Sequence, residues 1–104
     1  MKSTTLRKKI EVLVDAPLRR RLQDIADEAG LNGYTWYRTF GGFGSQGRWF
    51  DDQVTGGAGS KLLLTAILDD EKADEFLSKL EPLLDELGLH VMISQVEVIR
   101  AERY

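Results

Sequence analysis

Two strand-forming segments follow one another in the middle of the chain, and only a glycine-rich stretch separates them. The first, Gly33 to Phe40, is rich in aromatic and β-branched residues. The second, Lys61 to Leu68, is almost entirely apolar. Seven of the ten glycines lie between Gly41 and Gly59, a density that disfavours regular structure. The middle of the chain therefore predicts two strands joined by a long loop.

A strand and a helix are expected on the N-terminal side of this pair. Apolar residues alternate over Lys8 to Val14, as in a strand with one buried face. The run Asp15-Ala16-Pro17 then signals the start of a helix, because proline is tolerated in a first turn. Helical spacing of apolar residues predicts this helix near residues 17 to 29, with Gly30 as its C-terminal stop.

A second helix and a last strand are expected on the C-terminal side. The acidic run Asp69-Asp70-Glu71 caps the helix, and Gly88 ends it. Pro82 lies inside the helical pattern and should kink or divide the helix near Glu81. The segment from His90 to Arg100 is predicted to be a strand. The helix has a stripe of apolar residues on one side: Ala73, Phe76, Leu77, Leu80, Leu84 and Leu87.

The resulting order is βαββαβ, in one domain that covers residues 1–104. It predicts an α+β, ferredoxin-like fold with a four-stranded antiparallel sheet, two helices on one face and a long loop between the second and third strands. The strand Lys61 to Leu68 has apolar residues on both faces, although one face should lie in water. We therefore expect another copy of the chain to cover that face in a closed homo-oligomer.

Composition excludes several classes of function. The chain has 14 basic and 17 acidic residues, a net charge of −3, which does not suggest a protein that binds nucleic acid through bulk charge. It has no cysteine and a single histidine, His90, so neither a conventional zinc site nor a catalytic Ser–His–acid set is expected. We expect no enzyme activity. No apolar run has membrane-spanning length and no signal-peptide pattern is present, so a cytoplasmic location is expected.

Two segments offer anion-binding chemistry. Backbone N–H groups of the turn Gly41 to Gly47 can converge on an anion, with Ser45 as an added donor and Arg48 or Lys61 as a source of charge. The same glycines also fit a flexible hairpin loop. Arg100 and Arg103 suit phosphate binding, although solvated terminal charge is the better explanation if no other residue indicates a phosphate.

Three spaced motifs resemble those of the PII signalling superfamily over about Lys8 to Arg103. They are Gly33-Tyr34-Thr35, Gly42-Phe43-Gly44-Ser45-Gln46-Gly47 and Val96-Glu97-Val98-Ile99-Arg100. PII proteins carry Gly-x-Thr on the second strand, Gly-Phe-Gly-x-Gln at the start of a long T-loop, and an arginine on the last strand. This chain departs from most of them because their second glycine-rich loop, which contains a lysine, is reduced here to Leu87-Gly88-Leu89-His90. A serine, Ser45, also replaces the arginine of Gly-Phe-Gly-Arg-Gln.

The pattern Gly-Gly-x-Gly-Ser at residues 56–60 resembles the PII-like branch linked to inorganic carbon. That branch includes the SbtB bicarbonate-transporter regulators and the carboxysome-associated PII proteins. The cysteine-bearing C-terminal extension of SbtB has no counterpart here, which favours the carboxysome-associated type.

The resemblance implies a homotrimer with adenine nucleotides in three clefts between subunits. Loss of the lysine favours ADP or AMP, with ATP and cyclic AMP as further candidates, and the branch makes bicarbonate a candidate co-signal. Thr35 would lie beside the adenine, and Arg100 and Arg103 would meet phosphates. Gly88 and Leu89 would contribute backbone contacts. The residues that would wrap the ribose and phosphates are Gly42, Phe43, Gly44, Ser45, Gln46 and Gly47.

The main hypothesis is a non-enzymatic sensor in which a bound nucleotide changes the order of loop 41–60. That loop would then dock a partner, such as a bicarbonate transporter or a carboxysome-related protein, with Trp49 and Phe50 as anchors. An RNA-binding module of the RNA-recognition-motif type shares the βαββαβ order. It requires aromatic residues where this chain has Leu62-Leu63-Leu64-Thr65. A small enzyme or metal-handling protein would need a nucleophile–base pair or a metal cluster.

Overall fold

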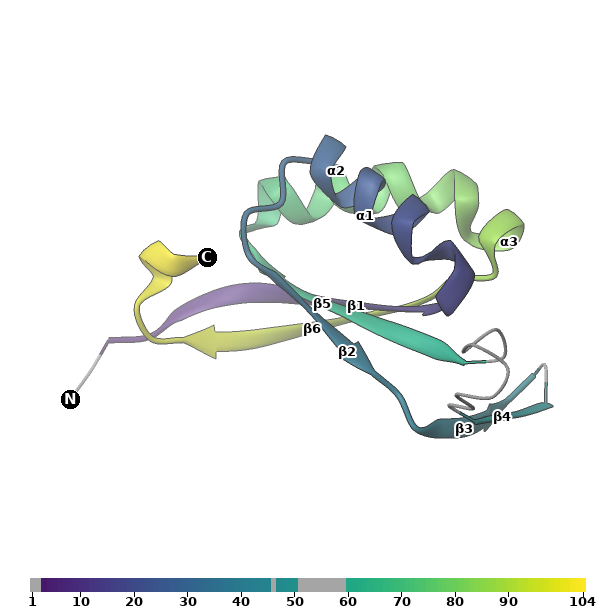
Figure 1. The fold of residues 1–104 in the computed structure, drawn as a ribbon. Helices are drawn as coiled ribbons and strands as arrows, with labels where there is room; N and C mark the ends of the chain where they lie inside the picture. The colour runs from purple at the N-terminus through teal and green to yellow at the C-terminus, as the bar shows by residue number, and fades with distance from the viewer. Residues whose placement is uncertain (1–2, 46, 51–59) are drawn as a thin grey trace.

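Four strands form one antiparallel sheet in the order β2-β5-β1-β6 (Figure 1). The computed structural model describes residues 3–45, 47–50 and 60–104. The strands are β1 (Thr5–Asp15), β2 (Tyr34–Arg38), β5 (Lys61–Leu68) and β6 (His90–Val98). Because β1 pairs with both β5 and β6, it lies inside the sheet, and β2 and β6 are the edges. The predicted four-stranded antiparallel sheet is confirmed.

Helices cover one face of this sheet (Figure 1). A 3-10 turn, η1 (Ala16–Leu18), leads into α1 (Arg19–Glu28), and α2 (Asp70–Leu80) continues through η3 (Glu81–Leu83) into α3 (Leu84–Leu87). The core lies between the helices and alternate residues of the inner strands. Together with the sheet order, this layer confirms the expected α+β ferredoxin-like fold. The largest fully buried side chains are those of Phe76, Ile10, Leu22, Leu64, Leu80, Val12 and Val14.

The second helical segment begins, breaks and ends where the sequence predicts. The Asp69 side chain caps α2 by accepting a hydrogen bond of 2.8 Å from the Lys72 N–H. Pro82 lies in η3, where the helix changes from α to 3-10 geometry. Gly88 closes the last turn with a φ of 62°, a left-handed conformation that favours glycine. Local residue chemistry therefore sets the position of the turn that follows α3.

The glycine-rich stretch is more regular than predicted. Its first part forms a two-stranded hairpin of β3 (Gly41–Gly44) and β4 (Gly47–Phe50), separate from the main sheet. The expectation of a loop without regular structure is therefore wrong for these residues. Along β4 the side chains alternate, so Trp49 lies on one face of the hairpin and Phe50 on the other. Residues 51–59, the outer part of the loop, lie outside the described residues.

The last strand is shorter than predicted. It ends at Val98, not at Arg100. Arg100 has a φ of 66°, which turns the chain out of the extended conformation and into the 3-10 turn η4 (Ala101–Arg103). The two C-terminal arginines therefore follow a bend beyond the end of β6.

The face of the sheet opposite the helices carries apolar side chains. Strand register puts Tyr37, Leu63 and Leu13 in one row across β2, β5 and β1. Leu63 and Leu13 are half-buried, whereas Tyr37 is 52% exposed. Met92 of β6 adds a further half-exposed apolar side chain on this face. The apolar character predicted for the uncovered face is thus present in the structure.

Candidate functional site

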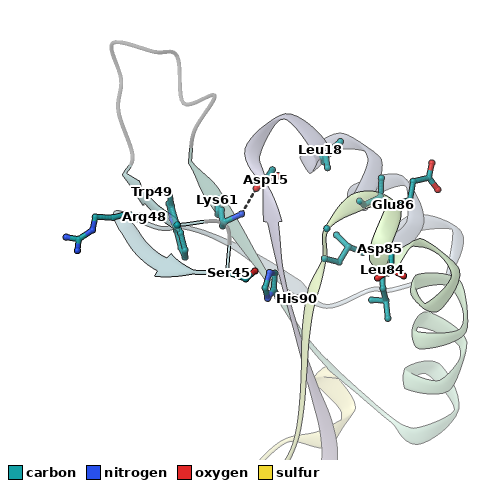
Figure 2. Close-up of a pocket in the computed structure, with 14 residues that line it drawn as sticks. Asp15, Leu18, Ser45, Arg48, Trp49, Lys61, Leu84, Asp85, Glu86 and His90 are labelled. Carbon is teal, nitrogen blue, oxygen red and sulfur yellow. Dashed lines mark hydrogen bonds and ion pairs between the residues drawn. The ribbon is translucent and has the colours of Figure 1, made fainter.

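A cleft of about 680 Å³ opens where the β3–β4 hairpin faces the turn between α3 and β6 (Figure 2). The end of β1 and the first residue of β5 line it between these two elements. A smaller cavity of about 130 Å³ adjoins the cleft and shares Ser45, Gly47, Trp49, Lys61 and His90 with it. The site therefore combines four segments that are far apart in the sequence.

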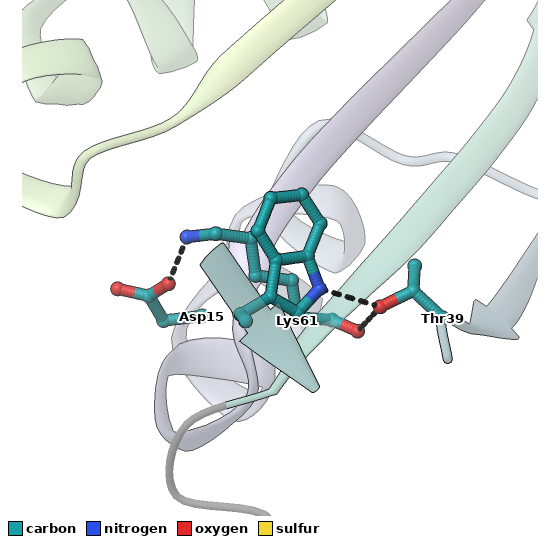
Figure 3. Close-up of polar contacts among 4 residues, drawn as sticks. Asp15, Thr39 and Lys61 are labelled. Atoms are coloured by element: carbon teal, nitrogen blue, oxygen red, sulfur yellow. Dashed lines mark hydrogen bonds and ion pairs between the residues drawn. The ribbon is translucent and has the colours of Figure 1, made fainter. Parts of the chain in front are cut away.

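Lys61 is held in the cleft between a carboxylate and an aromatic ring. Its Nζ lies 2.5 Å from the Asp15 carboxylate and 5.3 Å from the centroid of the Trp49 ring (Figure 3). The Lys61 side chain is 14% exposed, whereas that of Asp15 is 50% exposed. Lys61 is therefore a positive charge that is held in place by the Trp49 ring and by an anionic partner, the Asp15 carboxylate.

A hydrogen-bond relay attaches the hairpin to the start of β5. The Trp49 indole Nε1–H donates to Thr39 Oγ1 over 3.2 Å, and the Thr39 hydroxyl donates to the backbone carbonyl of Lys61 over 2.6 Å (Figure 3). Trp49 therefore packs inward, against Lys61. Its predicted role as a partner anchor does not fit this position, because a half-buried ring that packs on its own chain offers little surface to another protein.

Gly42 makes this packing possible. A Cβ atom at residue 42 would lie 2.4 Å from the Trp49 ring, far inside van der Waals contact. Residue 42 lies directly opposite Trp49 in the hairpin, so any side chain there would push the ring away. The second glycine of the Gly-Gly-Phe-Gly motif is thus required by the indole, independently of any ligand.

The turn after α3 uses its own amide groups. The Leu89 N–H donates to the Leu84 carbonyl over 3.0 Å, and the Gly88 N–H donates to the Asp85 carbonyl over 3.3 Å. These bonds satisfy the end of the helix. They also leave neither amide free to bind an anion in this conformation. The backbone contacts expected from Gly88 and Leu89 would therefore have to come from carbonyl groups or from a rearranged turn.

Side chains of both charges line the cleft. Lys61 and Arg48 are positive, and Asp15, Asp85 and Glu86 are negative. The Arg48 guanidinium lies 5.8 Å from the centroid of the Phe43 ring, and Figure 2 shows it directed away from the cleft. His90 and the Ser45 hydroxyl complete the polar lining.

The structure brings six of the predicted binding residues to this region. Ser45, Gly47, Gly88 and Leu89 line the cleft itself. Phe43 and Gly44 line the adjoining cavity. The hairpin base and the α3–β6 turn, predicted to share a ligand, thus face one another.

The other predicted residues lie elsewhere. Gly42 is beneath Trp49, and Thr35 lies on β2, opposite Thr65 of β5. Arg100 and Arg103 follow β6 at the end opposite to His90. Gln46 lies outside the described residues.

Asp15, Trp49 and His90 are cleft residues that the sequence interpretation did not place there. The sequence predicts Asp15 at the start of a helix, Trp49 as a partner anchor and His90 as the first residue of a strand. His90 is the last residue of the shortened loop Leu87-Gly88-Leu89-His90. This position was the sequence feature that could have indicated a place in the cleft. Only strand pairing reveals the neighbourhood of Asp15 and Lys61, which are directly opposite each other in β1 and β5.

Comparison with known proteins identifies the family. The model of the nitrogen regulatory protein P-II family matches residues 7–103, so this chain belongs to that family. The family consists of regulatory proteins, and membership sets aside the alternative of an RNA-recognition motif. Among curated proteins, none matches the sequence significantly.

Solved structures with the same fold include PII-like proteins from two bacteria. CPII from Thiomonas intermedia K12, bound to ADP, AMP and bicarbonate, is similar with a TM-score of 0.87 and 20% identity, over 99% of this chain and 97% of that chain. A putative PII-like signalling protein from Thermus thermophilus has a TM-score of 0.78 and 23% identity, over 98% of each chain. The apo form of CPII has a TM-score of 0.74 and 19% identity, over 96% of this chain and 99% of that chain.

Two other kinds of feature are missing from the described residues. Across residues 3–45, 47–50 and 60–104, no three histidine or acidic side chains gather as a metal site would require. No helix in that part of the chain is long and apolar enough to cross a membrane.

Proposed function

We propose that this protein is a PII-like sensor that binds an adenine nucleotide in the cleft and signals the bound state to a partner protein. One observation carries the proposal. The cleft is lined both by Ser45 and Gly47 of the hairpin and by Gly88 and Leu89 of the facing turn. A ligand between them would join the base of the signalling loop to the rigid end of α3.

A second chain completes this site. Along β6, the eight residue steps from His90 to Val98 span about 26 Å, so Arg100 and Arg103 cannot reach the cleft of their own chain. Thr35 lies four residue steps, roughly 13 Å, along the sheet from the row that contains Lys61. In a homotrimer these residues would face a neighbour's cleft. The apolar uncovered face provides the surface for such packing.

ADP and AMP are the nucleotides that we favour, with ATP and cyclic AMP as further candidates. Three acidic side chains line the cleft, and the amides of the α3–β6 turn are occupied. Both features disfavour a long polyphosphate. CPII, whose fold this chain shares, was solved with ADP, AMP and bicarbonate, which supports bicarbonate as a second ligand here.

Signalling would pass through loop 41–60. The relay from Trp49 through Thr39 to the Lys61 carbonyl, together with the packing of the Trp49 ring over the Lys61 ammonium, couples the hairpin to the floor of the cleft. A ligand that competes for Lys61 would therefore change the order of the hairpin. Phe43 and Phe50, which are 76% and 63% exposed, would then contact the partner, for which a bicarbonate transporter or a carboxysome-related protein is the candidate.

Native mass spectrometry and titration calorimetry test this proposal together. A trimer that binds ADP or AMP is the expected result. A monomer, or a trimer that gives neither heat nor a thermal shift with AMP, ADP, ATP and cyclic AMP, would contradict it. The double variant Ser45→Ala with Arg103→Ala should weaken nucleotide binding while the far-UV circular dichroism stays unchanged.

A further inference from the structure

The His90 side chain is a polar group of the cleft that forms no hydrogen bond or ion pair with the described residues. It begins β6, its side chain is exposed, and it lines both the cleft and the adjoining cavity. Within the described residues, the imidazole has neither a hydrogen-bond nor an ion-pair partner. His90 and Ser45 both line the cleft and the adjoining cavity, at the point where the hairpin faces the turn (Figure 2). Its two nitrogens are therefore available to a ligand.

The other positive groups of the cleft are engaged. Lys61 is paired with Asp15 and covered by Trp49, and the Arg48 guanidinium lies over the Phe43 ring. The amides of Gly88 and Leu89 are bonded within the helix end. The His90 imidazole and the Ser45 hydroxyl are thus side-chain donors that remain available to an oxyanion in the cleft of one chain.

The charge balance of the cleft depends on His90. Asp15, Asp85 and Glu86 add negative charge to the lining, Lys61 is paired with Asp15, and the Arg48 guanidinium is directed away from the cleft. A protonated His90 therefore adds positive charge to a lining in which the carboxylates outnumber the positive groups that point into the cleft. Imidazole is the side chain whose charge ordinarily changes between pH 5 and 8.

We propose that His90 is a specificity-determining ligand for an oxyanion, and that its protonation makes anion binding in the cleft depend on pH near neutrality. This inference rests on the proposed function, because it takes the cleft to be the ligand site. The charged and polar groups that line the cleft with His90 come from every element around it: Asp15 of β1, Lys61 of β5, Ser45 and Arg48 of the hairpin, and Asp85 and Glu86 of α3, with the Arg48 guanidinium directed away. A protonated imidazole donates from both nitrogens and adds charge, whereas a neutral one has a single donor. The oxyanion is either a nucleotide phosphate or bicarbonate.

Titration calorimetry with ADP at about pH 6 and about pH 8 tests the proposal on the full-length protein. The proteins compared are the wild type, His90→Gln, which keeps a donor without charge, and His90→Lys, which keeps the charge at both pH values. The phosphate group of ADP also titrates, but its contribution is common to all three proteins and cancels in the comparison. Far-UV circular dichroism and thermal unfolding verify that each variant folds.

The wild type should lose about tenfold more ADP affinity between the two pH values than His90→Gln, the size expected for one charge-assisted hydrogen bond. His90→Lys should bind ADP more tightly than His90→Gln at both pH values and should show the same pH dependence as His90→Gln, because neither variant side chain changes its charge between the two pH values. If ADP binds but the wild type and His90→Gln show equal pH dependence, the role of His90 is overturned while the proposed function stands. If no protein binds ADP at either pH, both are overturned.

Two further ligands identify the oxyanion. Adenosine, which has no phosphate, should bind the three proteins alike, and a His90-dependent pH effect with adenosine would overturn the proposal. Bicarbonate alone, at about pH 8, should bind His90→Lys more tightly than His90→Gln if the imidazole contacts bicarbonate. If His90 affects ADP but not bicarbonate, the nucleotide phosphate is its partner.

Discussion

The Trp49 ring covers the Lys61 ammonium, with 5.3 Å between Nζ and the ring centroid. The two residues belong to different sheets, so this contact fixes the hairpin over the entrance to β5. A cation against an indole face contributes about 0.5–1 kcal/mol where exposed and more where water is excluded. This aromatic contact and the Thr39 relay attach the hairpin to β5, and the hairpin has exposed phenylalanines on its other face.

Gly42→Ala should therefore displace Trp49 and loosen the hairpin. The new methyl group would lie 2.4 Å from the ring, and relief of such overlap costs typically about 1–3 kcal/mol. Hydrogen exchange of residues 41–50 should rise, while the global unfolding temperature falls much less. Gly44→Ala is the matched control, because its added Cβ would meet the same ring only at 3.9 Å. Equal exchange in the two variants would contradict the packing argument.

Asp15→Asn should release Lys61 for ligand binding. Because the Asp15 carboxylate is half-exposed, the ion pair contributes only about 0–1 kcal/mol to stability, and the unfolding temperature should change little. Removing one of three negative charges from the cleft should raise ADP affinity severalfold at low salt, and the gain should shrink as salt screens the cleft. Calorimetry at two salt concentrations measures this. Asp74→Asn, at an exposed position of α2 outside the cleft lining, is the control, and an equal effect there would refute the role of Asp15.

Local chemistry made much of the fold predictable from the sequence. The cap at Asp69, the break at Pro82 and the stop at Gly88 each act within a few residues, and all three appear where they were expected. The apolar pattern of β5 likewise predicted the apolar side chains that lie on the face opposite the helices. Such signals depend on neighbouring residues alone, so a single sequence carries them.

The features that sequence reasoning missed depend on long-range pairing. The Trp49 ring of the hairpin packs on Lys61, which is twelve residues later in the sequence. Lys61 in turn pairs with Asp15 across β1 and β5. Glycine content alone predicts a loop. It does not show that the Trp49 ring covers Gly42, and this packing depends on a residue seven positions later. The end of β6 at Val98 was missed for a related reason, since Arg100 adopts a left-handed conformation that β-propensity does not predict.

Asp69→Ala should destabilise the domain by about 1 kcal/mol through loss of the α2 cap. The carboxylate accepts the Lys72 N–H and also carries negative charge at the positive end of the helix dipole. Thermal unfolding measures the loss. Asp69→Asn should recover most of the stability, because the amide oxygen also accepts that hydrogen bond. If the two variants were equally destabilised, charge and not capping would be the cause.

Leu63→Glu should abolish the homotrimer and, with it, nucleotide binding. Leu63 lies in the row between Tyr37 and Leu13 on the face opposite the helices, where a carboxylate would remain unpaired once a neighbouring subunit covered it. The helix-side core is untouched, so the monomer should keep its far-UV circular dichroism. Native mass spectrometry and calorimetry with ADP give the two readouts. Arg21→Glu, on the exposed surface of α1, changes charge in the same direction and should leave both unaffected. A Leu63→Glu monomer that still bound ADP with wild-type affinity would show that one chain forms the complete site, against the proposed contribution of Thr35 and Arg100 from a neighbour.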